Sequence, residues 1–152
     1  MLESKRAPIR TYRDLRVYQQ SMALLGPIHE LVLGFPEYER YALADQMRRA
    51  ARSVPTNIVE GYGRRSSARD FKHFMGISMG SANELVVHLE ITGQLEYASP
   101  KLCDEYVRAY ESIGKQLHML MTNWKSDGRL PTSNIQHPTS LRKDSSFQEP
   151  SE

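Results

Sequence analysis

One segment of this chain, residues 67–97, constrains the fold more than any other feature. Its apolar and small side chains recur at alternating steps of four and three residues, at Phe71, Met75, Ser78, Ala82, Leu85, Leu89 and Thr92. That spacing is typical of the seam along which helices pack in a bundle. Ser67 stands before the first turn and Asp70 follows it three residues later, as at a capped helix start. The segment therefore predicts a long helix inside a helical bundle.

A second stripe follows the other side of the same helix. It is formed by small and apolar residues, namely Gly76, Gly80, Val87 and Ile91. A glycine inside a helix costs about 1 kcal/mol relative to alanine, so two glycines four residues apart indicate the close approach of another backbone. The neighbour is either a further helix of the same bundle or another subunit. We favour the subunit.

Residues 45–65 predict another helix, with one apolar side and one cationic side. The apolar side holds Leu43, Met47, Ala50, Val54, Asn57, Ile58 and Gly61, whereas Arg48, Arg49 and Arg52 lie opposite. Pro55 costs roughly 3 kcal/mol in a helix interior and more often ends a helix than kinks it. The stripe nevertheless continues past Pro55 in phase, so we expect a kinked helix that begins near residue 39 and fades at Gly61 and Gly63.

Two further helices complete the expected architecture. Residues 14–33 form the first, with Thr11 as N-cap and a kink at Pro27, and the last begins at Ser99 and Pro100. The seam of the last helix is expected at Leu102, Tyr106, Ala109, Ile113, Leu117, Leu120 and Trp124. No segment shows the alternation of a strand. The fold class is therefore all-α, an antiparallel up-down-up-down four-helix bundle with a kinked second helix.

The two ends of the chain differ from the expected bundle, which spans residues 12–125. Residues 1–11 form a basic N-terminal arm, and residues 126–152 are polar with three prolines. A segment with so few apolar residues cannot offset its ordering entropy, so we expect a disordered tail. The single Cys103, the missing signal peptide and the lack of a long apolar run favour a soluble cytoplasmic protein that does not bind membranes.

Charge is distributed unevenly, although the net charge is only +2. Residues 48–72 hold seven Lys and Arg against two acids, whereas residues 84–111 hold six acids against two bases. The basic block either faces an anionic partner, meets the acidic block of a neighbouring copy in a head-to-tail ring, or is only a solvated surface.

Motifs for catalysis, metals, cofactors or small-molecule substrates are missing from the sequence. Glu84 and His88 are four residues apart, a spacing more typical of a surface hydrogen bond than of metal ligands. Arg69 and His73 lie one helical turn apart, close to the arrangement of HEPN-type RNases but with fewer residues between them. We therefore expect a protein without enzymatic activity and keep the RNase as a less favoured alternative.

Several motifs together resemble one family, the four-helix-bundle proteins encoded in intervening sequences of bacterial 23S rRNA genes. The resemblance covers about residues 12–124 and rests on Phe35-Pro36 with Glu39, Tyr41 and Leu43; Asp45-Gln46 with Arg49-Ala50; Ser53, Pro55, Asn57, Ile58, Glu60 and Gly61; Gly63-Arg64; Phe71 and Phe74; and Gly80-Ser81 with Glu84-Leu85. It implies a homopentamer associated with RNA or ribosomes. Distant relatives in retroelements bind a reverse transcriptase and nucleic acid.

These observations lead to a hypothesis about the cationic residues. Together with the basic N-terminal arm, six cations are expected to bind the RNA backbone, namely Arg48, Arg52, Arg64, Arg65, Arg69 and Lys72. Only Tyr12 and Tyr62 lie near the basic residues for base stacking. Some arginines, such as Arg49 and Arg64, are expected to pair with Glu60 or Glu84 and would then not be available to RNA. Structural or interface roles are expected for Arg49, Pro55, Asn57, Glu60, Gly61, Gly76, Gly80, Ser81 and Glu84. The alternative function is a protein-interaction scaffold for a nucleic-acid enzyme such as a reverse transcriptase.

Overall fold

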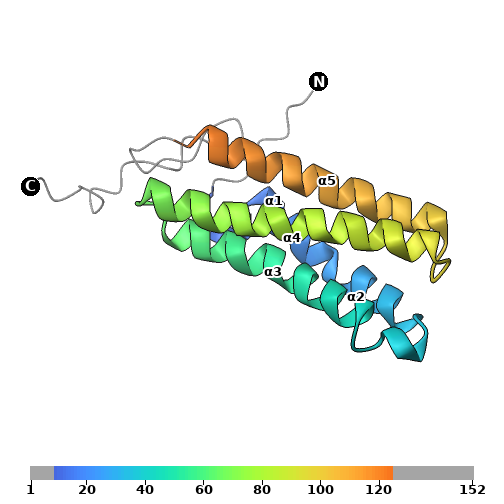
Figure 1. Cartoon of the computed structure of the whole chain (residues 1–152). Helices are drawn as coiled ribbons and strands as arrows, with labels where there is room; N and C mark the ends of the chain where they lie inside the picture. Colours follow the sequence, from blue (N-terminus) through green and yellow to red (C-terminus); the bar gives the residue numbers. More distant parts are fainter. Residues whose placement is uncertain (1–8, 125–152) are drawn as a thin grey trace, which may run out of the picture.

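The computed structural model describes residues 9–124, and this part of the chain is helical without strands (Figure 1). Its elements are the short 3-10 helices η1 (Tyr12–Asp14) and η2 (Glu37–Glu39) and the α-helices α1 (Arg16–Ala23), α2 (Leu25–Leu33), α3 (Leu43–Gly63), α4 (Ala68–Gln94) and α5 (Pro100–Thr122). Since α1 and α2 follow each other directly, the arrangement is consistent with a four-helix bundle. The all-α prediction is confirmed for these residues. Residues 1–8 of the predicted arm and the predicted tail lie outside them.

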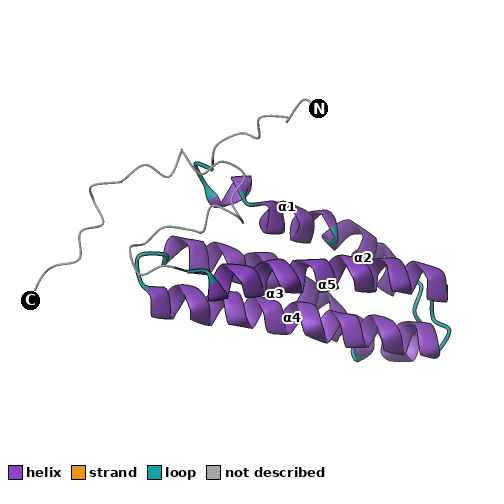
Figure 2. Cartoon of the chain, turned by 90° about the horizontal axis from the view of Figure 1, so that it is seen from above, coloured by secondary structure: helices purple, strands orange, loops and turns teal. Residues whose placement is uncertain are grey.

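The long helix α4 packs between α3 and α5 (Figure 1), and α1 and α2 lie on the opposite side of the bundle from α4 (Figure 2). The predicted seam of α4 is confirmed, since its buried residues are Phe71, Met75, Ser78, Ala82, Leu85, Leu89 and Thr92. At one end of the core, the rings of Phe71 and Trp124 stack with centroids 4.2 Å apart. Burial of this continuous apolar surface is the main force that stabilises the bundle.

The predicted helix starts are confirmed for the last two helices. The Ser67 hydroxyl accepts a hydrogen bond from the Asp70 N–H at the start of α4. The Ser99 hydroxyl accepts one from the Leu102 N–H at the start of α5, where Pro100 is the first helical residue. These caps satisfy backbone donors that have no partner within the helix.

The first predicted helix is divided in the structure. Thr11 and Asp14 form the expected capping box, but it caps η1, and a break at Leu24 separates α1 from α2. Pro27 explains the break, because it has no N–H to donate to the carbonyl of Ala23 four residues earlier. The single helix over residues 14–33 is therefore wrong, whereas the interruption near Pro27 was expected.

The helix α3 runs through Pro55 to Gly63, so the prediction that this proline does not end the helix is confirmed. Its start is four residues later than expected. The segment after Pro36 forms the 3-10 turn η2, and Ala42 has a ψ of −106°, outside the helical region. An α-helix can therefore begin only at Leu43.

The first half of the predicted α5 seam is displaced by one residue. The structure buries Cys103, Val107 and Tyr110, and leaves Leu102, Tyr106 and Ala109 half-buried. The reason is that α5 contacts both α4 and α1, so its buried side is wider than one seam. The second half, from Ile113 to Trp124, is buried as predicted. None of the helices in residues 9–124 is long and apolar enough to cross a membrane.

Candidate nucleic-acid and subunit interfaces

The six cations predicted to bind RNA do not form one compact cluster. Arg48 and Arg52 lie in the first half of α3, whereas Arg64 and Arg65 follow its C-terminal end. At 1.5 Å per residue, Arg48 and Arg64 are roughly 24 Å apart along the helix direction. Arg69 and Lys72 lie on the first turns of α4, close to the second group. The basic block is thus divided between the start of α3 and the α3–α4 connection.

At the start of α3, the two neighbouring arginines differ from the expectation. Arg48 donates to the carbonyl of Arg40 at 3.0 Å, lies 3.7 Å from the Asp45 carboxylate, and keeps only 24% of its side chain exposed. Arg49 pairs with Asp45 at 3.0 Å and remains 79% exposed. Arg49 therefore has an acidic partner, but this is Asp45 rather than Glu60 or Glu84. Arg48, expected to be available to a ligand, is the more enclosed of the two.

At the α3–α4 connection, two arginines have partners within the chain. Arg64 lies 3.7 Å from Glu60 and 3.8 Å from Asp70, with its guanidinium over the ring of Phe74. Arg65 donates to the carbonyl of Tyr62 and lies over the Tyr62 ring. The expected pairing of Glu60 with Arg64 is present. Both arginines help to fix the geometry of the connection.

The remaining three predicted cations are Arg52, Arg69 and Lys72. All three side chains are exposed, and no ion pair joins them to any residue in the described part of the chain. Binding a phosphate there would not break an existing ion pair. These residues are the best-placed cations for an anionic ligand.

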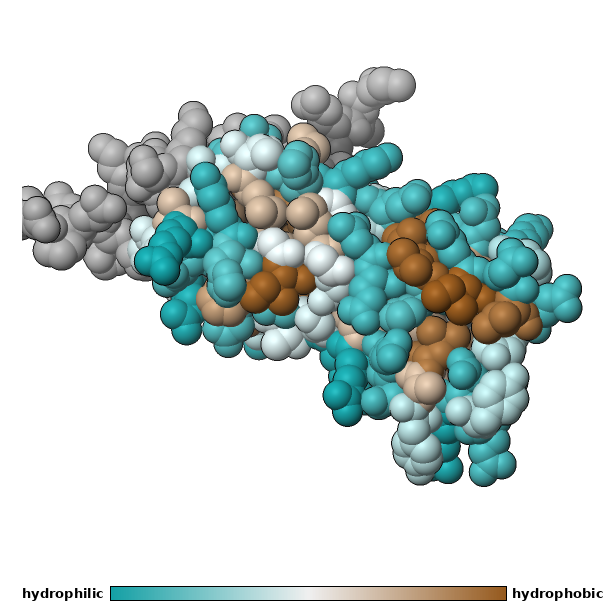
Figure 3. Space-filling model, viewed as in Figure 1, coloured by the Kyte–Doolittle hydropathy of each residue, from teal (hydrophilic) through white to brown (hydrophobic). Residues whose placement is uncertain are grey.

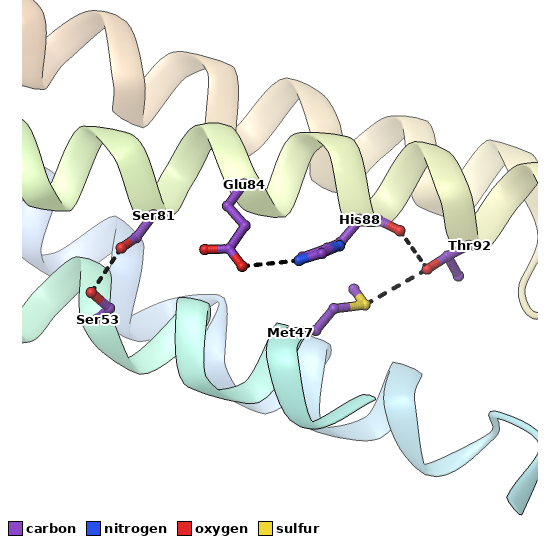
Figure 4. A network of polar contacts seen from close by, with 6 residues as sticks. All are labelled: Met47, Ser53, Ser81, Glu84, His88 and Thr92. Carbon is purple, nitrogen blue, oxygen red and sulfur yellow. Dashed lines mark hydrogen bonds and ion pairs between the residues drawn. The ribbon is translucent and has the colours of Figure 1, made fainter. Parts of the chain in front are cut away.

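Polar residues of two sequence motifs meet where α3 crosses α4 (Figure 4). The Ser81 hydroxyl donates to the Ser53 hydroxyl at 2.7 Å, and the Asn57 amide donates to the hydroxyl and carbonyl of Ser53. One turn away, the buried Ser78 hydroxyl donates to the carbonyl of Val54 at 2.7 Å. These bonds hold the two helices in a fixed register, because the Asn57 amide and the hydroxyls of Ser78 and Ser81 each have a partner on α3.

Further along the same crossing, Glu84 lies 3.1 Å from His88 on its own helix (Figure 4). Glu84 therefore pairs with His88 and not with an arginine. Thr92 donates to the His88 carbonyl and lies 3.7 Å from the Met47 sulfur. No second carboxylate joins this pair, and within residues 9–124 no three His, Cys, Asp or Glu side chains are placed to hold a metal ion.

Three glycines with expected structural or interface roles have different surroundings, and close approach was predicted for two of them, Gly76 and Gly80. A Cβ added to Gly61 would meet Met75 Cε at 2.5 Å and Phe74 Cβ at 3.2 Å, so α3 and α4 approach closely there. At Gly76 the nearest atom is Met121 Cε at 3.6 Å, and at Gly80 nothing lies within 4 Å. Gly76 therefore packs against α5 of the same bundle at ordinary contact distance, and the close backbone approach expected at Gly76 and Gly80 is not found within the described residues.

The outer side of α4 is an exposed apolar surface, called here the α4 outer stripe. Its large side chains are 38–53% exposed and are Ile77, Val87, Ile91 and Leu95, with the exposed Gly80 between them. Figure 3 shows brown side chains along α4 on this side of the molecule. Arg69 and Lys72 precede the stripe, and Glu84 and Glu90 lie within its length. The brown side chains form two groups, separated by white and teal residues (Figure 3). Exposed apolar side chains grouped in this way are typical of a protein contact.

The tyrosines expected near the basic residues are not available for stacking. Tyr62 is buried, and half-buried Tyr12 packs edge-on against Tyr18 with Arg13 over its ring. The freely exposed tyrosines are instead Tyr38 and Tyr41, between α2 and α3, with exposed fractions of 74% and 82%. Sequence reasoning missed both, although their position among charged residues in a short connection indicated exposure.

Comparisons with known proteins give one family and one fold. The family model described as 23S rRNA-intervening sequence protein matches residues 13–119. Among solved structures, the chain resembles a protein of unknown function from the S23 ribosomal protein family of Bacteroides thetaiotaomicron, at 22% identity and a TM-score of 0.65. The similarity covers 73% of this chain and 99% of that one. No curated protein matches the chain.

Proposed function

Because the chain belongs to the 23S rRNA-intervening sequence protein family, we propose that it binds RNA, rRNA or a ribosome-associated RNA, as a non-enzymatic homo-oligomer. The observation that carries this proposal is the outer side of α4. It begins with the exposed cations Arg69 and Lys72 and continues as the α4 outer stripe. One helix thus offers both a surface for phosphates and a surface for another copy.

The affinity for RNA comes from the exposed cations that have no ion pair in residues 9–124, because these can bind phosphates without first breaking an ion pair within the chain. Arg52, Arg69 and Lys72 contact phosphates, and Arg49 adds a charge whose exposed ion pair is worth at most about 1 kcal/mol. Such contacts recognise the backbone and not the bases. Binding through this surface is therefore weakly sequence-selective.

Each copy is an antiparallel four-helix bundle that contacts the next copy through its α4 outer stripe. Five copies form a ring, and the ring is cytoplasmic. The copies are joined through the apolar residues of the stripe and not through a head-to-tail contact of its basic and acidic ends, so Arg69 and Lys72 stay available for phosphates. Gly80, with no atom near its Cβ position, leaves room for the backbone of a neighbouring copy. Repetition of the cations around the ring raises the affinity for a long RNA.

Fluorescence anisotropy with a labelled 23S rRNA fragment tests RNA binding. The variant Arg52→Ala/Arg69→Ala/Lys72→Ala is compared with the wild type between about 50 and 200 mM salt. We expect the slope of log affinity against log salt to fall by about 2 to 3 in the variant, since each phosphate contact contributes about 0.7 to 0.9. Arg108→Ala, which removes an exposed cation paired with Asp104 on α5, is the matched control. Equal slopes, or no binding by the wild type at low salt, would reject the proposal.

Two other functions have narrower support. The α4 outer stripe also suits a helix of a different protein, such as a nucleic-acid enzyme. In that case the partner protein should stay bound to the chain during purification after nuclease treatment.

An RNase would rely on Arg69 and His73, which are exposed one turn apart on α4, with the His73 ring edge-on to Phe74. Labelled RNA incubated with the protein is expected to stay intact. Cleavage that His73→Ala abolishes would show that the protein is an enzyme.

A further inference from the structure

The connection between α2 and α3 lies at one end of the molecule (Figure 1). Two exposed tyrosines belong to this connection. Tyr38 lies in η2, and Tyr41 follows it by three residues. Other large aromatic side chains, such as Phe71, Tyr110 and Trp124, are buried in the core. The bundle core therefore gains little from these two side chains, because 74% of Tyr38 and 82% of Tyr41 is exposed.

Tyr38 is nevertheless held in place. Its hydroxyl is 3.1 Å from the Tyr97 hydroxyl, and the two rings lie edge to face with centroids 6.4 Å apart. Tyr97 in turn packs against Phe35 at 5.3 Å. The hydrogen bond with Tyr38 raises the pKa of Tyr97 to about 12, so the Tyr97 hydroxyl stays protonated at neutral pH. Tyr38 is thus anchored through its hydroxyl, which leaves most of its ring surface for a ligand.

Tyr41 has a cation over its ring. The Arg40 guanidinium lies 5.4 Å from the ring centroid, and the Arg40 carbonyl accepts the hydrogen bond from Arg48 that ties this turn to α3. A ring has two faces, and with 82% of Tyr41 exposed the face away from Arg40 is open. Stacks of a base, an aromatic ring and an arginine are a common way to hold an unpaired nucleotide.

Charge around the two rings is balanced, unlike at the α3–α4 connection. The bases Arg40, Arg48 and Arg49 are matched by Glu37, Glu39 and Asp45. A ligand held here is therefore held by stacking more than by attraction to phosphates. Stacking onto the rings requires a free base face, which a duplex does not offer except at its ends.

We propose that Tyr38 and Tyr41 form a stacking platform for unpaired RNA bases, which gives the protein a preference for single-stranded over duplex RNA. The inference rests on the proposed function, since it presupposes that the chain binds RNA. It adds a ligand class to that function, because the cations alone do not distinguish paired from unpaired strands. The contribution of the cations to RNA affinity should fall with salt, whereas the contribution of base stacking on the tyrosines should depend little on salt.

Anisotropy of the full chain with a single-stranded RNA oligonucleotide, and with the same strand paired to its complement, tests the platform. Tyr38→Leu/Tyr41→Leu keeps apolar side chains but removes the aromatic faces. We expect its affinity for the single strand to fall roughly 5- to 150-fold for each stacked base lost, with duplex affinity and the salt slope unchanged. Tyr38→Phe/Tyr41→Phe keeps the rings but removes the hydroxyl that anchors Tyr38, so it should lose much less affinity for the single strand than the leucine variant. Leu33→Ala, at an exposed apolar site on α2, is the matched control.

The outcomes separate this inference from the function it rests on. If the wild type binds RNA with a steep salt dependence but the leucine variant binds the single strand equally well, the platform is wrong and the proposed function stands. If the wild type binds no RNA at low salt, both fail. If the leucine variant loses assembled mass in light scattering, the tyrosines serve a contact between proteins, and the platform is again overturned.

Discussion

Replacement of Gly61 by alanine tests the close approach of α3 and α4. The added Cβ would lie 2.5 Å from Met75 Cε, 3.2 Å from Phe74 Cβ and 3.4 Å from the Phe71 carbonyl oxygen. Met75 is fully buried, so its terminal methyl cannot move into solvent. Overpacking of this kind costs about 1 to 3 kcal/mol, and the gain in helix propensity returns about 1 kcal/mol. We expect a net loss of about 1 kcal/mol in the free energy of unfolding.

Gly63→Ala is the matched control, because no atom lies within 4 Å of its Cβ position in the same helix. It should be neutral or more stable than the wild type by up to about 1 kcal/mol. Urea unfolding followed by circular dichroism, at one protein concentration, should place the two midpoints on the order of 1 M apart. Combining Gly61→Ala with Met75→Leu, which lacks the Cε methyl, should recover part of the loss. Equal stability of the two alanine variants would refute the close approach.

Three further predictions concern single side chains. Ser81→Ala removes the hydrogen bond to Ser53 between α3 and α4, and should lower the free energy of unfolding by about 1 kcal/mol in the same urea assay. Backbone N–H groups of the preceding turn lower the pKa of Asp14 below its ordinary 3.8, so its contribution to stability is present above that value and is lost as the pH falls through the lowered pKa. Asp14→Asn should therefore flatten the dependence of Tm on pH in that acidic range, and an unchanged profile would contradict the assignment. Burial raises the pKa of the Cys103 thiol, so a thiol reagent at neutral pH should label the native protein slowly and the urea-unfolded protein fast. Rapid labelling of the native protein would contradict the buried position of Cys103.

Much of the fold follows from periodicity and helix-cap chemistry. The α4 seam could be predicted because all seven of its residues fall on one helical face, and Ser67 and Ser99 are side chains that accept hydrogen bonds at helix starts. The start of α5 was harder, since Leu102 and Cys103 each begin an apolar row one residue apart. Which row is buried depends on where α1 and α4 lie, and this is a property of the tertiary structure.

The candidate sites were less predictable than the fold. Helical spacing places Arg48 and Arg49 on the outer side of α3, but it does not show that Arg48 reaches the carbonyl of Arg40 in the preceding turn. The sequence did not predict a role for Tyr38 and Tyr41, because both lie outside the basic block of residues 48–72 and their exposure depends on how the α2–α3 connection folds. Long side chains and short connections take positions that spacing along the sequence does not encode.

The mass of the purified chain in solution, measured by light scattering, tests most directly whether the α4 outer stripe joins copies of this protein. We expect the wild type to exceed the 17.5 kDa of one chain, with five copies for the proposed ring. Val87→Glu/Ile91→Glu should reduce the mass to that of one chain with unchanged helical content, whereas Met119→Glu, at an exposed site on α5, should not. A wild type of 17.5 kDa at every concentration, or a Val87→Glu/Ile91→Glu variant with the wild-type mass, would contradict this interface.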